Sequence, residues 1–383
     1  MITALDETLM HQSPVPFAQT VVSDHRFFDR MWLGGHCREN IRFLMGMANY
    51  KNTNTCDGFF TVLMDEKQYN LRVSRPLLPN PEEMKVGPIS IEIVKSLEAM
   101  RLVVKAGADQ PMAADLLFRA TSPVHLEPLH HTRRDGRLTQ DYMRFDQHGL
   151  IEGWLSVEGR RIDATGWFGA RDHSWGVRPA TGGYEPTTAV VADDSFGAAL
   201  SGVNDGWLAI YLFFETPDFA GYIQRQENAA GHILFHDGDI ACNGEPAARI
   251  IDMQHDLDFV PGTRTCGSGT LRCTLQGGEV VTVRFDSLLP GTVYKGTGYD
   301  NGYDDERGLG FHRGDLLEYD VYDVSDVEQV GLPDGRTIRP WHRELPCTVE
   351  VNGQSGMGYA TVLNNGDIER YGLTGGFTNR RTA

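Results

Sequence analysis

Residues 149–178 read GLIEGWLSVEGRRIDATGWFGARDHSWGVR, and this stretch decides the fold class. Apolar side chains alternate over 149–157, which predicts a strand with one buried face. Glu158-Gly159 follows as a tight turn, and 160–167 is the predicted return strand of a hairpin. Because two-residue turns join antiparallel strands, we expect antiparallel β-structure at the centre of the chain.

The same alternation recurs on both sides of this hairpin. A second hairpin is predicted where Asn352-Gly353 joins 347–351 to 358–363. Glycine accounts for 43 of the 383 residues, above the usual share of about 7%, and such an excess supplies the turns between short strands. Further strands are expected at 59–64, 68–73, 88–94, 102–104, 207–214, 221–226, 232–235 and 280–285.

Helical patterns are few, with one or two turns expected at 24–32 and a single turn at 81–85. The chain is therefore predicted to be all-β, and its length favours two ordinary barrels over one very large barrel. Proline and glycine around the middle place the boundary there, giving domains 1–183 and 184–383. A long loop is expected at 290–314, either a functional lid or edge, or a flexible insertion on a barrel rim.

Composition and charge exclude several classes of protein. The chain has 35 Lys and Arg against 52 Asp and Glu, and this net charge of −17 disfavours nucleic-acid binding and anionic membranes. No run of about 18 apolar residues predicts a membrane-spanning helix, and 1–14 lacks the apolar core of a signal peptide. Six scattered cysteines without a CxxC pair favour reduced thiols in the cytoplasm.

Familiar cofactor motifs are missing from the sequence. There is no phosphate-binding G-x-x-x-x-G-K-[ST] loop, no dinucleotide fingerprint, no G-x-S-x-G, no H-E-x-x-H and no EF-hand loop. We therefore expect neither a cofactor nor a metal.

Unusual chemistry is concentrated in 166–178, where two tryptophans, an acid, a histidine and two arginines lie between glycines. In a strand Asp172 would face one side, while Arg171, His173 and Trp175 would face the other. This row could carry chemistry, or it could lock two strands or domains together.

A second polar row covers 124–131. If this segment is extended, His125, Glu127 and His131 share one face, which either points to solvent or lines a polar pocket. A metal site is disfavoured there because no fourth ligand is identifiable.

A longer pattern runs through 144–178, made of Gln147-His148-Gly149, Gly153 and Gly169-x-Arg171-Asp172-His173-Ser174-Trp175-Gly176-x-Arg178. It resembles the AttH-like and carotenoid 1,2-hydratase (hydroxyneurosporene synthase) superfamily. The resemblance implies two lipocalin-like antiparallel β-barrels in tandem, with few short helices, and with the Asp-His-x-Trp-Gly core closing the first barrel.

Members of that superfamily include hydratases of terpenoid double bonds, a flavonoid hydratase and pericyclase-like enzymes. A histidine and a tryptophan of the motif and a downstream aspartate are implicated in the hydratases. The matching positions here are His173 and Trp175, and Asp205 is our choice for the aspartate, with Asp193 and Asp194 as rivals.

Adding water to an alkene needs an acid that protonates carbon, a surface that stabilises the cation and a base that deprotonates water. We expect Asp205 to be the acid and Asp172 to organise the site. Trp175 and Trp167 would stabilise the cation through their ring faces, and His173 would be the base. Further binding candidates are Trp167, Arg171, Arg178, Glu127, His131 and Trp207.

The predicted function is that of a cofactor-free hydratase, dehydratase or isomerase-type lyase. Its substrate would be a hydrophobic small molecule of terpenoid, steroid or polyketide-like character. The alternative is a non-catalytic carrier of an apolar ligand, since the same barrels bind ligands without chemistry. A homodimer is compatible with the sequence, and no nucleic-acid partner is expected.

Overall fold

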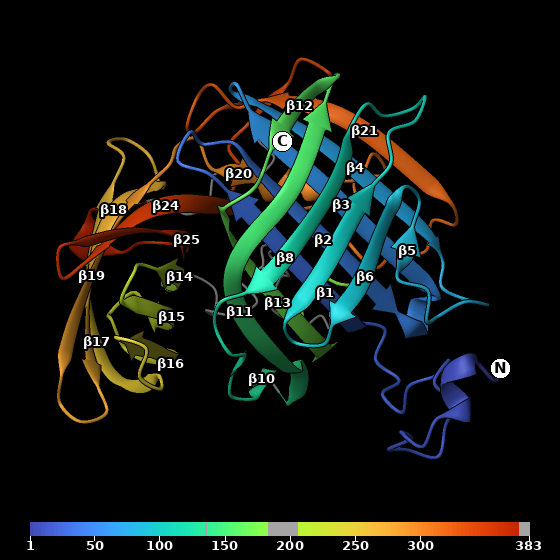
Figure 1. Cartoon of the computed structure of the whole chain (residues 1–383), viewed down its shortest axis with the longest axis horizontal. Helices are drawn as coiled ribbons and strands as arrows, with labels where there is room; N and C mark the ends of the chain where they lie inside the picture. Colours follow the sequence, from blue (N-terminus) through green and yellow to red (C-terminus); the bar gives the residue numbers. More distant parts are fainter. Residues whose placement is uncertain (135, 183–205, 375–383) are drawn as a thin grey trace.

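The computed structural model describes residues 1–134, 136–182 and 206–374. Over these ranges the chain is nearly all β and forms two antiparallel sheets that lie side by side (Figure 1). The four helical segments within these ranges are single 3-10 turns: η1 (Ala4–Glu7), η2 (Lys51–Thr53), η3 (Tyr294–Thr297) and η4 (Glu369–Tyr371). The predicted all-β fold is confirmed.

The first sheet has sixteen strands and curls around an apolar core. Its path runs β23-β22-β21-β4-β3-β2-β1-β13-β11-β8-β7-β6-β5, and β9, β10 and β12 pair with β11 off this path. The strands are β1 (Phe27–His36), β2 (Arg42–Tyr50), β3 (Thr55–Met64), β4 (Lys67–Pro76), β5 (Lys85–Val86), β6 (Ile89–Lys95), β7 (Ala99–Val104), β8 (Ala113–Ala120), β9 (His125–Leu126), β10 (His130–Arg134), β11 (Arg137–Val157), β12 (Arg160–Asp163), β13 (Trp167–Val177), β21 (Leu316–Asp323), β22 (Val330–Gly331) and β23 (Thr337–Ile338).

The second sheet closes into an eight-stranded barrel, because β19 pairs with both β18 and β24. Its interior is packed with apolar side chains, as expected for a barrel of this size. The strands are β14 (Trp207–Glu215), β15 (Phe219–Asn228), β16 (Ile233–Cys242), β17 (Ala248–Phe259), β18 (Cys266–Leu275), β19 (Val280–Ser287), β24 (Arg343–Val351) and β25 (Gln354–Asn365), with β20 (Thr292–Val293) added to β24.

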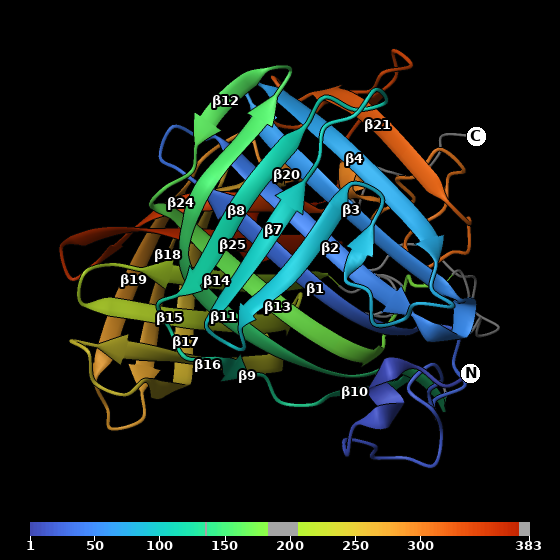
Figure 2. The same cartoon turned by 45° about the vertical axis from the view of Figure 1, so that its right-hand side comes forward.

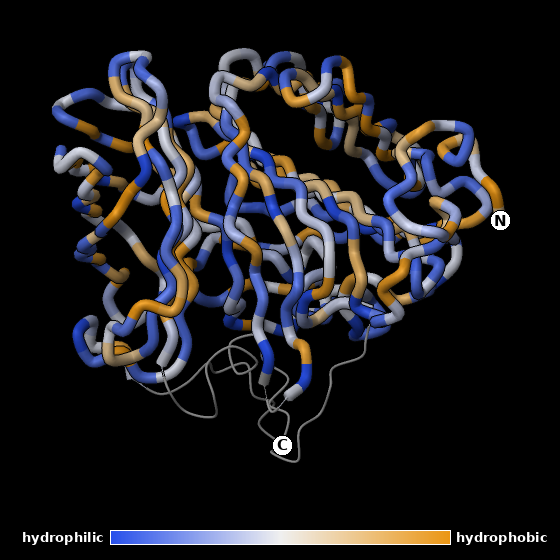
Figure 3. The backbone as a smooth tube through the Cα atoms, turned by 90° about the horizontal axis from the view of Figure 1, so that it is seen from below, coloured by the Kyte–Doolittle hydropathy of each residue, from blue (hydrophilic) through white to orange (hydrophobic). Residues whose placement is uncertain are grey.

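The chain crosses back to the first sheet late in the sequence. Strand β21 pairs with β4 over its whole length and lies along the edge of the first sheet (Figure 2). Residues of the second half therefore complete the first sheet. The proposed boundary at 183 falls at the edge of the undescribed residues and stays a prediction. Figure 3 shows the N-terminal segment beside the first sheet, on the side away from the second barrel.

Both predicted hairpins are confirmed. The turn residues Glu158, Gly159, Asn352 and Gly353 all have positive φ, as the twist of a two-residue hairpin turn requires. The expected helix at 24–32 is wrong. From Phe27 onward this segment is β1, which lies between β2 and β13, so pairing on both sides overrides any local helical preference.

The expected turn of helix at 81–85 is also absent from the described residues, because this segment runs through loop turns into β5. The described residues contain no helix long and apolar enough to cross a membrane. All six cysteines are free thiols.

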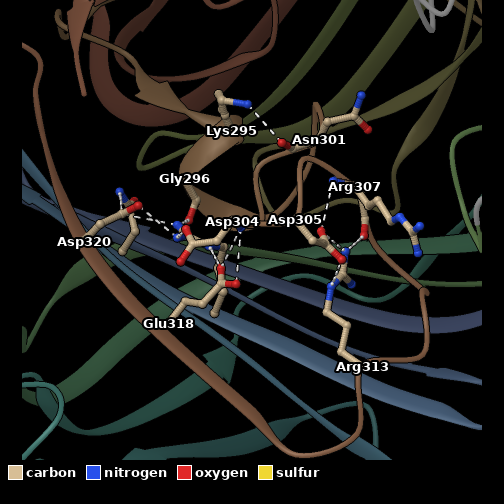
Figure 4. A network of polar contacts seen from close by, with 12 residues as sticks. Lys295, Gly296, Asn301, Asp304, Asp305, Arg307, Arg313, Glu318 and Asp320 are labelled. Atoms are coloured by element: carbon tan, nitrogen blue, oxygen red, sulfur yellow. Dashed lines mark hydrogen bonds and ion pairs between the residues drawn. The ribbon is translucent and has the colours of Figure 1, made fainter. Parts of the chain in front are cut away.

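The long loop at 290–314 is pinned by charged groups, as Figure 4 shows. Arg313 forms an ion pair with Asp305 at 2.9 Å, and the Lys295 ammonium donates to the carbonyl oxygen of Asn301 at 3.0 Å. Beneath the loop, the buried Arg72 guanidinium pairs with Glu318 and Asp320 of β21 and donates to the Gly296 carbonyl oxygen. These contacts fix the loop against the first sheet.

Candidate active site between the two sheets

Strand β13 presents two faces with different chemistry. Asp172 lies level with Asp146 on β11 and with Trp32 on β1, and these three side chains share the face turned toward the second barrel. We call this the outer face. His173 lies level with Phe145 and Met31 on the opposite, inner face, toward the core of the first sheet. The predicted alternation of the motif is confirmed.

Gly176 explains how closely the motif strand approaches β11. Its φ is +134°, and a Cβ there would lie 2.3 Å from the carbonyl oxygen of Asp141 and 2.6 Å from the Cα of Tyr142. Any side chain would force the strands apart. The glycine therefore keeps the outer-face carboxyls of β11 and β13 side by side.

Three carboxyl groups meet on the outer face, and we call Glu127, Asp146 and Asp172 the acid cluster. Glu127 and Asp146 are almost fully buried, and Asp172 is partly buried. The partly buried Arg144 guanidinium lies among them and contacts Glu127 at 3.3 Å. His130 is also hydrogen-bonded to Glu127. Arg144 acts on all three acids, and Arg30 and Arg178 also act on Asp172. Because the carboxyls are buried close together, their charges repel and not all of them can be ionised cheaply.

The cluster separates the proton affinities of its acids. Burial tends to raise the pKa of Glu127, but Arg144 and the His130 hydrogen bond outweigh it and lower that pKa. Burial and the neighbouring Glu127 charge raise the pKa of Asp146 well above its ordinary value. A hydrogen bond between these two carboxyls requires a proton, which Asp146 holds.

The pKa of Asp172 is subject to opposing effects. Burial raises its pKa, Arg144 opposes the shift and Glu127 adds to it. No hydrogen bond reaches its carboxylate from any of the residues that the structure describes. Paired carboxyls whose pKa values are pushed apart in one site are typical of acid–base catalysts.

The second barrel supplies the facing wall. Tyr222 of β15 donates a hydrogen bond to Glu127 Oε1 at 2.6 Å. Glu344 of β24 accepts hydrogen bonds from Tyr294 at 2.5 Å and from Thr361 at 2.7 Å. Burial raises the pKa of Glu344 to about 7, and the Asp172 charge contributes to the shift. The site is therefore built by both sheets and the loop that carries Tyr294.

Aromatic rings and unpaired polar atoms surround the acids. Several buried polar atoms here have no hydrogen-bond partner among the described residues, including Trp32 Nε1, Arg144 Nε, Asp146 Oδ2, Gln224 Nε2 and Tyr359 Oη. Buried polar atoms normally have partners, so unpaired ones mark a place where a bound molecule or water can be held. The rings form one buried cluster between the sheets: Trp32, Phe59, Phe168, Phe213, Tyr222, Tyr294 and Tyr359.

The inner face holds a different group. His173 Nε2 lies 2.7 Å from Asp29 Oδ1, and the His173 ring meets the rings of Phe145 and Trp175 edge to face. Trp175 is 37% exposed. Arg171 donates two hydrogen bonds to Gln147 Oε1, at 2.9 and 2.6 Å, and does not pair with Asp172. The structure thus separates His173 and Trp175 from Asp172.

Of the remaining predicted residues, Arg178 lies near the acid cluster: its guanidinium lies over the rings of Phe28 and Tyr299, and its charge acts on Asp172. The other two lie elsewhere, with Trp167 in the core of the first sheet and Trp207 packed against Trp341. Asp205, Asp193 and Asp194 lie outside the described residues.

The predicted polar row at 124–131 is not continuous. The strand is interrupted between β9 and β10, so Glu127 enters the acid cluster while His131 is exposed and pairs with Asp141 at 3.0 Å. His125 instead bridges to the second barrel, 2.6 Å from Asp237 and 2.7 Å from Asp239. These histidines therefore have different partners.

Sequence reasoning missed Asp146, Arg144 and His130, and also Tyr222, Tyr294 and Glu344. Asp146 and Arg144 could have been identified from the sequence, because polar and aromatic residues alternate along one strand immediately before the hairpin, at Tyr142, Arg144, Asp146 and His148. The residues of the second barrel carry no local signal, since only the contact between the sheets brings them to the site.

Comparisons with known proteins agree with this architecture. A family model described as a family of unknown function (DUF8625) matches residues 2–374. The chain belongs to this family. No curated protein sequence matches the DUF8625 chain significantly.

Solved structures resemble the DUF8625 chain in fold. An AttH-like protein from Nitrosomonas europaea is 9% identical, with a TM-score of 0.51 over 88% of this chain and 92% of that one. Kievitone hydratase from Nectria haematococca is 11% identical, with a TM-score of 0.44 over 88% of each chain. The protein CghA is 11% identical, with a TM-score of 0.44 over 92% of this chain and 95% of that one. The predicted AttH-like, two-barrel fold is confirmed.

Proposed function

We propose that the acid cluster is the active site of a cofactor-free lyase or isomerase that hydrates, dehydrates or shifts a double bond in an apolar small molecule. The observation that carries the proposal is Asp146, a buried carboxyl whose pKa is raised beside the ionised Glu127. A carboxylic acid that keeps its proton at neutral pH is the group needed to protonate carbon.

In the proposed hydration, Asp146 gives its proton to one alkene carbon and the π electrons form the new C–H bond. The cation left on the other carbon is stabilised by the electron-rich faces of nearby rings, of which Trp32 is level with Asp172. Water then adds to the cation, and its proton passes to Asp172. Transfer of that proton back to Asp146 restores the enzyme, so the net change is addition of one water.

Dehydration follows the same steps in reverse, and loss of a different proton from the cation gives an isomerised alkene. Asp172 suits the role of base because the residue is only partly buried and its carboxylate accepts no hydrogen bond from the described residues. The Asp146 Oδ2 atom is unpaired in the same way. His173 and Trp175, the positions that the resemblance to hydratases implicates, lie on the opposite face of β13 and take no part in this mechanism. Support for the reaction class comes from Asp172 of the same motif and from the buried acids beside it.

The experiment follows solvent deuterium into candidate substrates. The protein is incubated in D₂O with prenylated phenols, isoprenoid alkenes and tertiary allylic alcohols, and label at carbon is measured by mass spectrometry. Wild-type protein should label at least one class, and Asp146→Asn should lower the initial rate by about 100-fold or more, the typical contribution of general acid catalysis. Asp141→Asn is the matched control, because Asp141 is a half-exposed carboxyl on the same strand.

Two outcomes would contradict the proposal. Equal labelling by the wild type and Asp146→Asn would show that this carboxyl is not the acid. Tight binding of several apolar compounds without label in any of them would favour the alternative, a carrier without chemistry.

A further inference from the structure

A small cavity lies at one end of the second barrel, apart from the acid cluster. Its volume is about 30 Å³, which is room for about two water molecules or for the two oxygens of a carboxylate. Cys266, Leu345 and Val362 of the barrel core form part of its wall, so the cavity lies at a mouth of the barrel. Barrel mouths are frequent places for small ligands.

Positive charge prevails in the wall of this cavity. The lining arginines are Arg264, Arg339 and Arg343. Glu328 is the only acid among the lining residues that the structure describes. Two other acids act on these arginines from outside the wall, Asp326 and Asp367, and both are exposed to water, which screens them. This surplus stands out in a chain with a net charge of −17.

The deepest of these cations, Arg343, is buried without an acid in contact. Its guanidinium donates hydrogen bonds to the carbonyl oxygens of Val327, Glu328 and Pro340, which hold it in place but bring no formal negative charge. It forms no ion pair with any residue that the structure describes. Burial lowers the pKa of Arg343, although the charges of Glu328 and Asp326 oppose this shift. An anion beside this guanidinium would offset the cost of its burial.

Hydrogen-bond donors remain for such an anion. Each terminal nitrogen of Arg343 makes one bond to a carbonyl oxygen and keeps a second N–H. Arg339 is exposed and makes no hydrogen bond or ion pair with the described part of the chain. The acid in the wall is already engaged, because Glu328 Oε1 accepts a hydrogen bond from the Thr265 hydroxyl at 2.6 Å. Two guanidinium groups can therefore converge on one ligand.

We propose that this cavity binds a small carboxylate anion, held by Arg343 at its buried end and by Arg339 at its rim. The planar guanidinium fork matches the two oxygens of a carboxylate. The site is independent of the proposed catalysis. Arg343 and Glu344 are consecutive residues of β24 and point to opposite sides, so Arg343 lies in this cavity whereas Glu344 faces the acid cluster.

Acetate and acetamide are the probes that test the site, because they have nearly the same shape and only acetate is charged. The Trp341 indole N–H lines the cavity and donates to the Asn364 carbonyl oxygen at 3.1 Å, so its nuclear magnetic resonance signal reports on binding. Trp341→Phe assigns the signal. Titration at constant ionic strength should give a saturable shift with acetate, and acetamide should bind at least about tenfold more weakly. Equal affinities, or no saturable shift with acetate, would overturn the proposal.

Variants separate the cavity from general electrostatics. Arg339→Gln should weaken acetate binding by about fivefold, because it removes one charged donor at the rim. Glu328→Gln should strengthen binding by a similar factor, because it removes the repelling charge and keeps an oxygen for Thr265. The matched control is Arg336→Gln, since Arg336 is an exposed arginine of the same segment that pairs with Asp334 outside the cavity wall. It should bind acetate like the wild type. Equal weakening by Arg336→Gln and Arg339→Gln, or weaker binding in Glu328→Gln, would contradict the site.

Discussion

On the outer face of β13, Asp172 lies among charges that are largely withdrawn from water, whereas on its inner face His173 and Trp175 lie at an exposed end. Both faces belong to one short motif and differ by one residue in register. The outer charges interact strongly because little water screens them, and the inner pair is screened. Burial, more than residue type, therefore decides which face can shift a proton.

The largest effect is expected at the cation of the acid cluster. Arg144→Met leaves Glu127 buried without its main counter-charge, which typically costs about 3–5 kcal/mol of unfolding free energy. Urea unfolding followed by fluorescence measures the change. Arg171→Met on the inner face should cost about 1 kcal/mol, since Arg171 bonds only the neutral Gln147. Equal costs for the two substitutions would remove the distinction between the faces.

The second prediction concerns Glu344, which faces the cluster from the second barrel. Its pKa is about 7 in the folded protein against 4.5 for the free group, so the folded state holds more protons between these values. Stability should therefore fall by about 3 kcal/mol as pH rises from 4.5 through 7. Unfolding curves at pH 5 and pH 8 test this, and Glu344→Gln should flatten the dependence. An unchanged slope in the variant would assign the titration to another group.

A smaller pH effect is expected where His125 bridges the two sheets. Here the charged form of the side chain stabilises the fold, whereas for Glu344 the neutral form does. Hydrogen bonds to Asp237 and Asp239 outweigh burial and raise the pKa of His125 to about 9, so its charge stabilises the folded state. That contribution should be complete below pH 6.5 and lost as pH rises through 9. At pH 6, His125→Gln should cost about 2 kcal/mol, a figure reduced for partial exposure. A variant as stable as the wild type at pH 6 would contradict the bridge.

The smallest effect is expected at the exposed end of the inner face. Trp175→Leu should change the unfolding free energy by no more than about 0.5 kcal/mol, because the ring is partly in water and its loss leaves no buried cavity. Thermal unfolding is sufficient to measure it. A loss several times larger would mean that the ring is part of the core.

The hairpins, most strands and the two faces of the motif could be predicted from sequence, because alternation and turn residues are local signals. The strand that begins at Phe27 could not be predicted in this way, because it is formed by pairing with β2 and β13 on its two sides. Of the acid cluster, the sequence analysis named Glu127 and Asp172. The raised pKa of Asp146 comes from burial and from the neighbouring Glu127 charge, and Glu344 lies on the second barrel, so both depend on contacts that only the fold makes.

The central claim is that Asp146 keeps its proton at neutral pH. Infrared difference spectroscopy of the whole protein, wild type against Asp146→Asn, tests it without any substrate. We predict a carbonyl band of a protonated carboxylic acid at pH 7 that disappears in Asp146→Asn and remains in Asp141→Asn. A wild-type spectrum that shows only ionised carboxylate at this position would contradict the account.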